Sequence, residues 1–431
     1  MRRWPRSLRA SPCGARCQAR FRSEGLAYRA SLRRDFRRER AMAMPRACEQ
    51  GILLTVGMAW PGGPPVVQET RFAAHCEGAE RRSGPPPVEW GVPDADTPPA
   101  TPPELALLRL KEFVTAVGQP ASLRYSRVIA QRWILEPFAG WRCRPINVFA
   151  LTGRLQLANG RFMPVGWSGT GDGLARLQGG AARQHLVRVA RNAGEANATA
   201  PGDGPAVLAA QPAALIAHEA IGHFAEASAD SGVDLRHRLG CRLAADDIDV
   251  LDDPTCKAAA CYEVDDDGIM AMGATRILKD GVLVRQLHGR ASALAAGDIP
   301  TANARSSQIT LPPIPRMSNL IVLPGTSSFG ELVDSVGDGV IIHHLSHGFS
   351  RGLHVEARIV LGEIVATGRA TGRFFTGGRV EERVDVLTGC MARSRESELN
   401  PNALCGKHGQ ILYDVGTVAP ALQLSRLRIV G

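Results

Sequence analysis

Apolar residues recur with helical spacing from Leu105 to about Val117, and this periodicity predicts a helix there. Strand-like segments with glycine-containing turns between them follow the helix. They are Arg127–Ile134, Ile146–Leu151 and Arg161–Trp167. A second helix is predicted over Leu174–Arg191, and the polar run Asn192–Gly204 has the composition of a loop between domains. Residues 101–200 are therefore expected to form a small α/β domain.

The second half of the chain alternates between strand-like segments and turns, with one apolar helix near its start. Ala206–Ala210 is predicted to be a strand, and Pro212 begins a helix that continues through residue 223. Asp280-Gly281 is a strong hairpin signal between Ala274–Leu278 and Val282–Gln286. The strands expected further on, with a turn at Gly362, are Val340–His344, His354–Leu361 and Glu363–Gly368. We therefore expect an α+β fold, in which a small α/β N-terminal domain precedes a β-rich C-terminal domain at residues 201–431.

Residues 1–100 lack a comparable periodicity. Residues 1–47 are rich in arginine, and two interpretations compete: a basic disordered arm or presequence, and a start codon assigned too far upstream, with Met42 or Met44 as the true first residue. We favour the second, because arms that bind nucleic acid usually contain lysine. A strand-like run at Ile52–Val56 precedes a linker at Pro85–Pro103. Residues 1–100 are therefore expected to be disordered or to follow from a wrongly assigned start codon.

Composition and charge exclude several classes of partner. The formal net charge is +9, but residues 1–47 contain 14 arginines and three acidic residues, so their local charge of +11 leaves −2 for the remainder. Without a basic face in the body of the protein, nucleic acid is not an expected partner. Ten cysteines without paired spacing favour free thiols and a cytoplasmic protein. The longest apolar runs, such as Ile52–Trp60, are too short to cross a bilayer, and no apolar signal segment follows Arg2-Arg3, so no membrane contact is expected.

The apolar helix contains the run His218-Glu219-Ala220-Ile221-Gly222-His223. Two neutral imidazoles can bind a metal ion, and a glutamate beside them can act as general base on metal-bound water. Such histidines are usually at i and i+4, about 40° apart around a helix, whereas the i and i+5 spacing here corresponds to about 140° in a regular α-helix. Gly222 is therefore predicted to permit a bulge or break that lets His218 and His223 converge. The pattern alone leaves open that both are ordinary helix histidines and that Glu219 is solvated.

Several motifs follow this run in a defined order. They are Asp252-Asp253-Pro254-Thr255, Asp265-Asp266-Asp267-Gly268, Lys279-Asp280-Gly281, Asn303-Ala304-Arg305, Pro315-Arg316-Met317-Ser318-Asn319 and Cys405-Gly406-Lys407-His408-Gly409-Gln410. Together with the helix run, they resemble the TldD/PmbA peptidase family, in its TldD-type, metal-bearing branch. The resemblance covers roughly Tyr125–Val430 and is strong from Ala206 onward, whereas the N-terminal domain of the family looks shortened here.

The resemblance implies a zinc site. In that family the cysteine of the C-G-K-x-G-Q run is the third zinc ligand, so Cys405 is expected to join His218 and His223. A thiolate is a good zinc ligand, and three protein ligands leave the fourth position for water. Two competing candidates remain: Glu226, three residues after His223, and His408, three residues after Cys405.

The resemblance also implies a function for the C-terminal domain. A zinc-dependent peptidase is expected to cleave unfolded or extended peptides there, with Glu219 as general base on a zinc-bound water. Asn303, Arg305 and Arg316 are assigned to the substrate groove, with structural salt bridges as the equally weighted alternative for the two arginines. A dimer is expected, either of this chain or with a PmbA-like subunit. The competing function is a zinc-containing but non-catalytic peptide-binding partner of a related peptidase.

Other patterns in the chain allow different chemistry. Gly348-Phe349-Ser350-Arg351-Gly352 matches the G-x-S-x-G nucleophile elbow, but a strand-like segment follows where that motif needs a helix, so a hairpin turn is expected. A histidine cluster lacks the carboxylate or thiol spacing that would complete a metal site. Its members are His343, His344, His347 and His354. The acidic residues of 246–253 and 265–267 lack the alternating ligands of a calcium loop, so turn and capping roles are expected.

Overall fold

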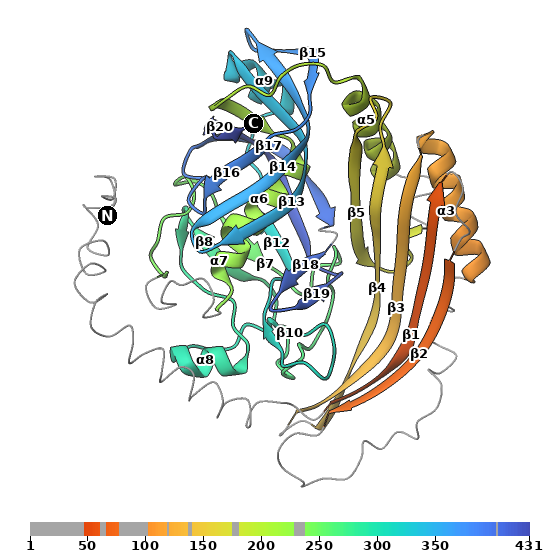
Figure 1. The fold of residues 1–431 in the computed structure, drawn as a ribbon. Coiled ribbons are helices and arrows are strands. Elements are labelled where there is room, and N and C mark those ends of the chain that lie inside the picture. Colours follow the sequence, from red (N-terminus) through yellow and green to blue (C-terminus); the bar gives the residue numbers. More distant parts are fainter. Residues whose placement is uncertain are drawn as a thin grey trace, which may run out of the picture.

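The computed structural model describes residues 47–60, 66–76, 102–118, 120–136, 140–174, 181–227, 238–401 and 404–431. Within them the chain forms two lobes, a long curved antiparallel sheet with two helices and a larger strand-rich lobe that contains several short helices (Figure 1). Strands dominate over helices in both lobes, which confirms the α+β class expected from the sequence.

The N-terminal lobe is built on a five-stranded antiparallel sheet with the order β2-β1-β3-β4-β5. Its strands are β1 Ala47–Trp60, β2 Val66–Cys76, β3 Ala121–Glu136, β4 Gly140–Gln156 and β5 Phe162–Thr170. The three strands predicted between residues 127 and 167 are confirmed, and each is longer than its sequence signal.

The sheet begins well before residue 101. β1 pairs with β3 along its whole length, from Ala47 opposite Ile134 to Trp60 opposite Ala121. The expectation that residues 1–100 lack a fold is therefore wrong for 47–60 and 66–76, while residues 1–46 lie outside the described part of the chain. The physical reason is that β1 depends on pairing with a strand far along the chain, so its own short signal underestimates it.

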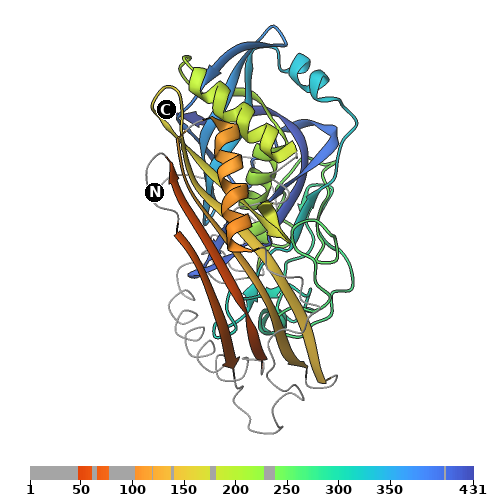
Figure 2. The same cartoon turned by 90° about the vertical axis from the view of Figure 1, so that its right-hand side faces the viewer.

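Two helices, α3 Pro103–Val117 and α5 Ala181–Glu195, lie together across the upper part of this sheet (Figure 2). α3 buries Leu110 and Phe113 and ends at Gly118, whose φ of 68° is the left-handed conformation that glycine adopts easily. α3 agrees with the predicted helix. α5 covers the later part of the predicted helix Leu174–Arg191 and ends at Glu195, and Gly173 and Leu174 are helical as well. α5 also contacts β14 and β15 of the other lobe. None of the described helices is both long and apolar enough to cross a membrane.

The C-terminal lobe contains a mixed sheet of twelve described strands, ordered β21-β16-β14-β13-β6-β20-β12-β7-β8-β9, with β15 beside β14 and β17 beside β20. These strands are β6 Gly204–Leu208, β7 Val250–Asp252, β8 Thr275–Lys279, β9 Val282–Leu283, β12 Asn319–Val322, β13 Gly339–Arg351, β14 His354–Ala366, β15 Arg369–Phe375, β16 Arg379–Arg383, β17 Cys390–Pro401, β20 Gly416–Leu427 and β21 Ile429–Val430. Outside it, two further pairs are β10 Ala304–Arg305 with β11 Ile314–Pro315, and β18 Cys405–Lys407 with β19 Gln410–Leu412. Two short helices near the strands of this lobe are α8 Arg290–Ala296 and α9 Phe329–Val336, besides the helix described below.

Two glycines show where turn prediction succeeds and fails. Between β8 and β9, Asp280 and Gly281 have φ of 50° and 73°, which confirms the two-residue turn predicted there. The turn predicted at Gly362 is wrong, because this residue lies inside β14. A methyl group on Gly362 would lie 2.1 Å from Phe375 Cζ, so the glycine serves a close ring contact instead of a turn.

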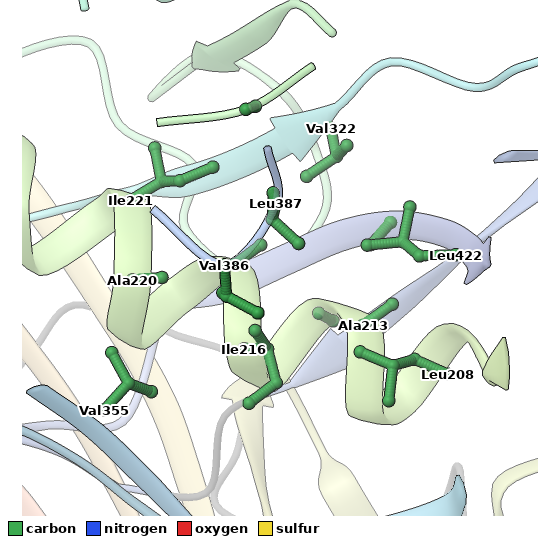
Figure 3. Close-up of a cluster of buried hydrophobic side chains, with 14 of the residues drawn as sticks. Leu208, Ala213, Ile216, Ala220, Ile221, Val322, Val355, Val386, Leu387 and Leu422 are labelled. Atoms are coloured by element: carbon green, nitrogen blue, oxygen red, sulfur yellow. The ribbon is translucent and has the colours of Figure 1, made fainter. Parts of the chain in front are cut away.

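The helix with the candidate chemistry lies in the core of the C-terminal lobe. It consists of α6 Ala210–Ala217, a π-helical turn η2 His218–Gly222 and α7 His223–Ala225. Its side chains Ala213, Ile216, Ala220 and Ile221 are fully buried. Aliphatic side chains from the surrounding strands and loops cover it in Figure 3, among them Leu208, Val322, Val355, Val386, Leu387 and Leu422. The helix is apolar on most of its surface and is held within the core, so its position is set by packing.

Candidate metal centre

The helix distorts at the His218–His223 run. The N–H of His223 donates to the carbonyl oxygen of His218, five residues earlier, where an α-helix would use the residue four earlier. The wider turn brings residues with this spacing to the same side of the helix, and the His218 and His223 ring centroids are 4.8 Å apart. The deformation predicted near Gly222 is therefore confirmed.

Gly222 acts through its small size and not through an unusual backbone angle. Its φ of −59° and ψ of −57° are ordinary for a right-handed helix. A methyl group at this position would lie 1.9 Å from Met317 Sδ, and Met317 is fully buried. The glycine therefore makes room for the Met317 side chain against the π-helical turn.

The third candidate ligand comes from a hairpin near the end of the chain. Cys405 begins β18, and the turn His408-Gly409, with φ of 51° and 75°, leads into β19. Cys405 Sγ lies 3.3 Å from His218 Nε2 and 3.7 Å from His223 Nε2. The structure thus brings the three predicted ligands together, whereas His408 is exposed in the turn and is not part of the cluster.

The donor atoms of these three residues suit a zinc ion in type and spacing. All of them lie within 4.8 Å of one another. Around a tetrahedral zinc ion, a nitrogen ligand and a sulfur ligand are about 3.5 Å apart. The two sulfur–nitrogen distances here are close to that value. Two imidazoles and one thiolate also form a ligand set that zinc accepts, with a fourth position left for a small molecule.

Glu226 lies behind His223 and not beside the ligand atoms. Its Oε2 is 2.9 Å from His223 Nδ1, the ring nitrogen on the far side from the site. The carboxylate also accepts the N–H of Met317 and pairs with Lys407. Burial alone would raise the pKa of this carboxyl, but Lys407, His223 and Arg316 hold it well below its usual range. A carboxylate in this position orients a ligating imidazole and leaves Nε2 as the ligand atom.

Cys405 lies in a positively charged environment. The Arg316 guanidinium donates to the Cys405 carbonyl oxygen at 2.5 Å, and both residues are buried. Burial would raise the pKa of the Cys405 thiol, but Arg316 and the two imidazoles hold it well below its usual range. Because a metal binds the thiolate, this environment favours the ligating form.

Glu219 faces a pocket beside the three candidate ligands. Its Oε2 lies 3.9 Å from His223 Nε2. The pocket has a volume of about 350 Å³, and its lining includes the candidate ligands, Glu219, Phe349 and Leu404. A methyl group on Gly348 would lie 2.7 Å from Glu219 Oε1, so the β13 backbone passes directly against this carboxylate. Candidate ligands and a potential base therefore meet at one cavity.

Asn303, Arg305 and Arg316 do not line this pocket, which corrects their predicted role in substrate binding. All three are fully buried. Asn303 donates to Asp252, and Arg305 pairs with Asp414. The structural ion pairs that were the alternative are present for both arginines. The order of motifs along the chain carries no information on burial. It could not show whether these three residues line a substrate groove or lie buried beneath the site.

Two of the competing patterns have structural roles. The strand β13 contains most of the G-x-S-x-G match and returns directly into β14, which confirms the expected hairpin. In the histidine cluster, His344 Nδ1 lies 3.2 Å from His185 Nε2, and His343 pairs with Glu363. The described residues offer this imidazole pair no third group at ligand spacing.

The acidic residues 265–267 divide between expected and unexpected roles. Asp265 accepts backbone N–H groups in its own turn, and Asp267 accepts one at the start of α8, which confirms turn and capping roles. Asp266 is instead buried and pairs with Arg132 and Arg144 of the N-terminal sheet. Sequence reasoning misses this role because the partners lie on distant strands.

Lys407 and Asp252 also support the site, although the motifs that contain them gave neither residue a role there. Lys407 follows Cys405 by two residues on β18, and the alternation of a strand could have placed both side chains on one face, where Lys407 pairs with Glu226. Asp252 accepts from Ser318 Oγ at 2.6 Å and steadies the segment next to Met317. No spacing rule in the sequence indicates this second contact.

Comparisons with known proteins agree with a metallopeptidase-type domain. Residues 201–431, more than half of the chain, match the family model described as the PmbA/TldA metallopeptidase C-terminal domain. Fold and His-His-Cys cluster together thus define a member of a metallopeptidase class. The chain belongs to the PmbA/TldD family.

Individual relatives are similar over shorter stretches. A protein named "Metalloprotease" from Methanothermobacter thermautotrophicus is 39% identical over 127 residues, which are 29% of this chain and 28% of that protein. A "Zinc metalloprotease TldD homolog" from Saccharolobus solfataricus is 27% identical over 140 residues, 32% of this chain and 31% of that protein. The chain thus matches less than a third of each of these relatives. The crystal structure of TldE from Thermococcus kodakarensis has the same fold, with a TM-score of 0.67, 12% identity, and coverage of 94% of this chain and 100% of that one.

Proposed function

We propose that this protein is a zinc-dependent peptidase that cleaves unfolded or extended peptides. The observation that carries the proposal is the convergence of His218, His223 and Cys405 beside Glu219 at one pocket. Membership of a metallopeptidase family supports it, as does the zinc metalloprotease name of one relative.

In this proposal the chain supplies three ligand atoms, His218 Nε2, His223 Nε2 and Cys405 Sγ. A zinc ion held by these atoms would supply Lewis-acid polarisation of a peptide carbonyl and would lower the pKa of a water molecule to about 7. Glu226 engages Nδ1 of His223, so the opposite nitrogen keeps the lone pair that a ligand needs. Arg316 favours the Cys405 thiolate by its charge and holds the backbone of the same residue.

Glu219 has the role of general base. Its carboxylate lines the pocket and lies close to the ligand atoms, so it can reach a water molecule that attacks a peptide carbonyl there. It accepts a proton from that water at a carboxylate oxygen and passes it to the nitrogen of the departing peptide segment. A positioned base of this kind accelerates a reaction by about 10²- to 10⁴-fold.

The pocket favours a peptide in extended form. Phe349 and Leu404 are 57% and 47% exposed and offer apolar contacts at the pocket. A folded protein cannot present its main chain inside a cavity of about 350 Å³, whereas an unfolded segment can. Main-chain contacts of an extended segment have little sequence preference, which suits a substrate defined by its lack of structure.

We extend the proposal to assembly and location. Following the family resemblance, the protein works as a dimer, of this chain or with a PmbA-like subunit, which light scattering of the purified protein and a pull-down with such a subunit would test. The free thiols of Cys143 and Cys261 on the surface support a reducing compartment such as the cytoplasm.

Metal analysis beside a peptide digest tests the proposed activity. Wild-type protein should carry stoichiometric zinc, and Cys405→Ser should carry far less. Wild type should cleave an unstructured peptide, and Glu219→Gln should keep zinc but cleave at least about 100-fold more slowly. Absence of zinc from wild type, with no change in Cys405→Ser, would contradict the metal site. Zinc together with equal survival of the peptide in wild type and Glu219→Gln would favour the non-catalytic peptide-binding partner instead.

A further inference from the structure

A buried group of charges joins the two lobes. Arg132 Nη1 on β3 lies 2.8 Å from Asp266 Oδ2, and Arg144 Nη1 on β4 lies 2.6 Å from Asp266 Oδ1. Arg144 Nη2 is also 3.7 Å from Oδ2 of Asp414, a second carboxylate of the C-terminal lobe. Both arginines and Asp266 are buried. Their interactions are therefore screened far less than those of surface charges.

Asp414 connects these charges to the hairpin of the metal centre. It follows Leu412 by two residues, and Leu412 pairs with Cys405 across β18 and β19. Its Oδ1 atom forms an ion pair with Arg305, although the geometry is not that of an aligned hydrogen bond. Asp414 thus lies between Arg144 of the N-terminal sheet and Arg305 of the C-terminal lobe.

Arg305 extends the connection to the helix side of the metal centre. Arg305 Nη1 donates to the Met317 carbonyl oxygen at 2.8 Å, and the N–H of Met317 donates to Glu226 at 3.1 Å. Glu226 is the carboxylate that holds His223. The carboxylate of Asp414 therefore reaches two ligand-bearing segments, one through the chain and one through Arg305.

Tyr262 fixes both arginines that flank Asp414. The guanidinium carbons of Arg144 and Arg305 lie 4.5 Å and 5.3 Å from the centroid of its ring, and its hydroxyl donates to the Ala302 carbonyl oxygen at 3.0 Å. A planar guanidinium stacked on a ring keeps a defined orientation. The carboxylate between them is therefore held in place from two sides.

We propose that Arg144 is a positioning residue of the metal centre, through which the N-terminal sheet sets the hairpin that carries Cys405. The inference rests on the proposed zinc site. Arg132 provides the internal contrast, because it also pairs with Asp266 but none of its hydrogen bonds or ion pairs reaches Asp414. Two arginines thus join the same lobes, and of the two only Arg144 forms an ion pair with Asp414. The route from Arg132 to the hairpin is less direct, because it runs through the Ser306 carbonyl and the Ser307 N–H that donates to Gln410.

Zinc affinities of matched variants, measured by competition with a chromophoric chelator, test the proposal. Arg144→Gln and Asp414→Asn should each bind zinc about tenfold more weakly than wild type. The double variant should lose clearly less than the hundredfold that additive effects would give, because both changes remove the shared Arg144–Asp414 contact. Arg132→Gln should stay within about threefold of wild type, as expected for a site not coupled to the ligands. Equal weakening by Arg132→Gln and Arg144→Gln would overturn the proposal, since loosening of the lobe junction would then explain both.

Alkylation of Cys405 in the metal-free proteins provides a readout independent of zinc and of turnover. Arg144→Gln and Asp414→Asn should speed iodoacetamide labelling of Cys405 about threefold or more, because the hairpin opens more often. Arg132→Gln should not, and exposed Cys143 serves as the reference in peptide-resolved mass spectrometry. Asp414 is 13% exposed, so Asp414→Asn tests the contact even if Arg144→Gln disrupts the lobe junction. If wild type binds no zinc, the proposed function fails, and an unchanged labelling rate in both variants separately contradicts the positioning role.

Discussion

The helix and the hairpin of the metal centre hold their ligands by different forces. The helix with His218 and His223 is enclosed by aliphatic side chains, and both Ala220 and Ile221 are fully buried. Its distortion is accommodated by a gap at Gly222 that the neighbouring methionine fills. Such packing depends on volume to within a methyl group and hardly at all on pH or salt.

Among the described strands, β18 and β19 of the hairpin pair only with each other. Cys405 and Leu412 pack into the core, and charged contacts hold the hairpin as well. Lys407 pairs with Glu226, Arg316 donates to the Cys405 carbonyl oxygen, and Asp414 follows the second strand. Charged contacts are tolerant of small changes in shape but respond to pH and to the loss of one partner. The helix side of the site is therefore fixed by core packing, whereas the hairpin side also depends on charged contacts that a change of pH or of one partner can weaken.

The largest effect is expected from removing a ligand from either region. His218→Ala and Cys405→Ala should both weaken zinc binding at least about 1000-fold, or about 4 kcal/mol, because each removes one of three ligand bonds. Isothermal titration of metal-free protein with zinc measures the loss. Retention of stoichiometric zinc by either variant would mean that its region does not belong to the site, and the comparison would fail.

Adding one methyl group to the helix and one to the hairpin tests how far each of them depends on close packing. Gly222→Ala should lower the free energy of unfolding by about 2–3 kcal/mol, because the methyl overlaps Met317 in a filled core. Gly406→Ala is the matched control in the hairpin, where the added methyl meets no atom within 4 Å. Its effect should stay within about 0.5 kcal/mol. Denaturant unfolding of both variants measures the difference, and equal destabilisation would contradict the distinction drawn here.

Low pH should weaken the charged contacts and leave the apolar contacts unchanged. Burial opposes ionisation of Asp266, yet Arg132 and Arg144 lower its pKa to about 2 from the usual 3.8. The stability from this ionised group is therefore fully present above about pH 4 and is lost as the pH falls through about 2, an effect of about 2 kcal/mol. The difference in unfolding free energy between wild type and Asp266→Asn should shrink by that amount between pH 6 and pH 2. A difference independent of pH would show that the lobe junction does not depend on this charge.

The smallest expected effect concerns a single charge of the hairpin. Lys407→Met removes the ammonium group beside Glu226 and should weaken zinc binding about tenfold, or about 1.4 kcal/mol, because the carboxylate behind His223 is held less firmly. Lys279→Met, at an exposed position on β8, is the matched control and should leave the affinity unchanged. Competition with a chelator measures the zinc affinities of the two variants. Equal affinities would mean that packing, and not this charge, holds the hairpin in place.

Periodicity found most of the fold but not its longest-range parts. The helix α3 and strands β3, β4 and β5 follow from local patterns, because each buries one face along its own length. β1 and β2 were assigned to a segment without a fold, since their stability comes from the strand beyond the linker. The glycine at 362 imitates a turn signal, and only the Phe375 ring beside it reveals why a side chain is excluded.

The candidate site was partly predictable for the same reason. The spacing of His218 and His223 required a distorted helix, because the geometry of one turn depends only on neighbouring residues. Cys405 was implied by the family resemblance, and spacing alone would not have selected it. Asn303 and Arg305 come from equally clear motifs but lie beneath the site. Burial is a property of the assembled lobe and leaves no local signature.

By itself, the sequence determined the α+β class and the distorted metal helix. The family resemblance added Cys405 to the two histidines, with Glu226 and His408 as competing candidates. Only the tertiary structure decided that Glu226 stands behind His223, that Glu219 faces a pocket, and that the N-terminal sheet reaches the site through Asp414. The physical reason is separation along the chain. A helical turn is set by residues within five positions, whereas Cys405 Sγ and His218 Nε2 meet across 187 residues, through contacts that exist only once the C-terminal lobe has folded.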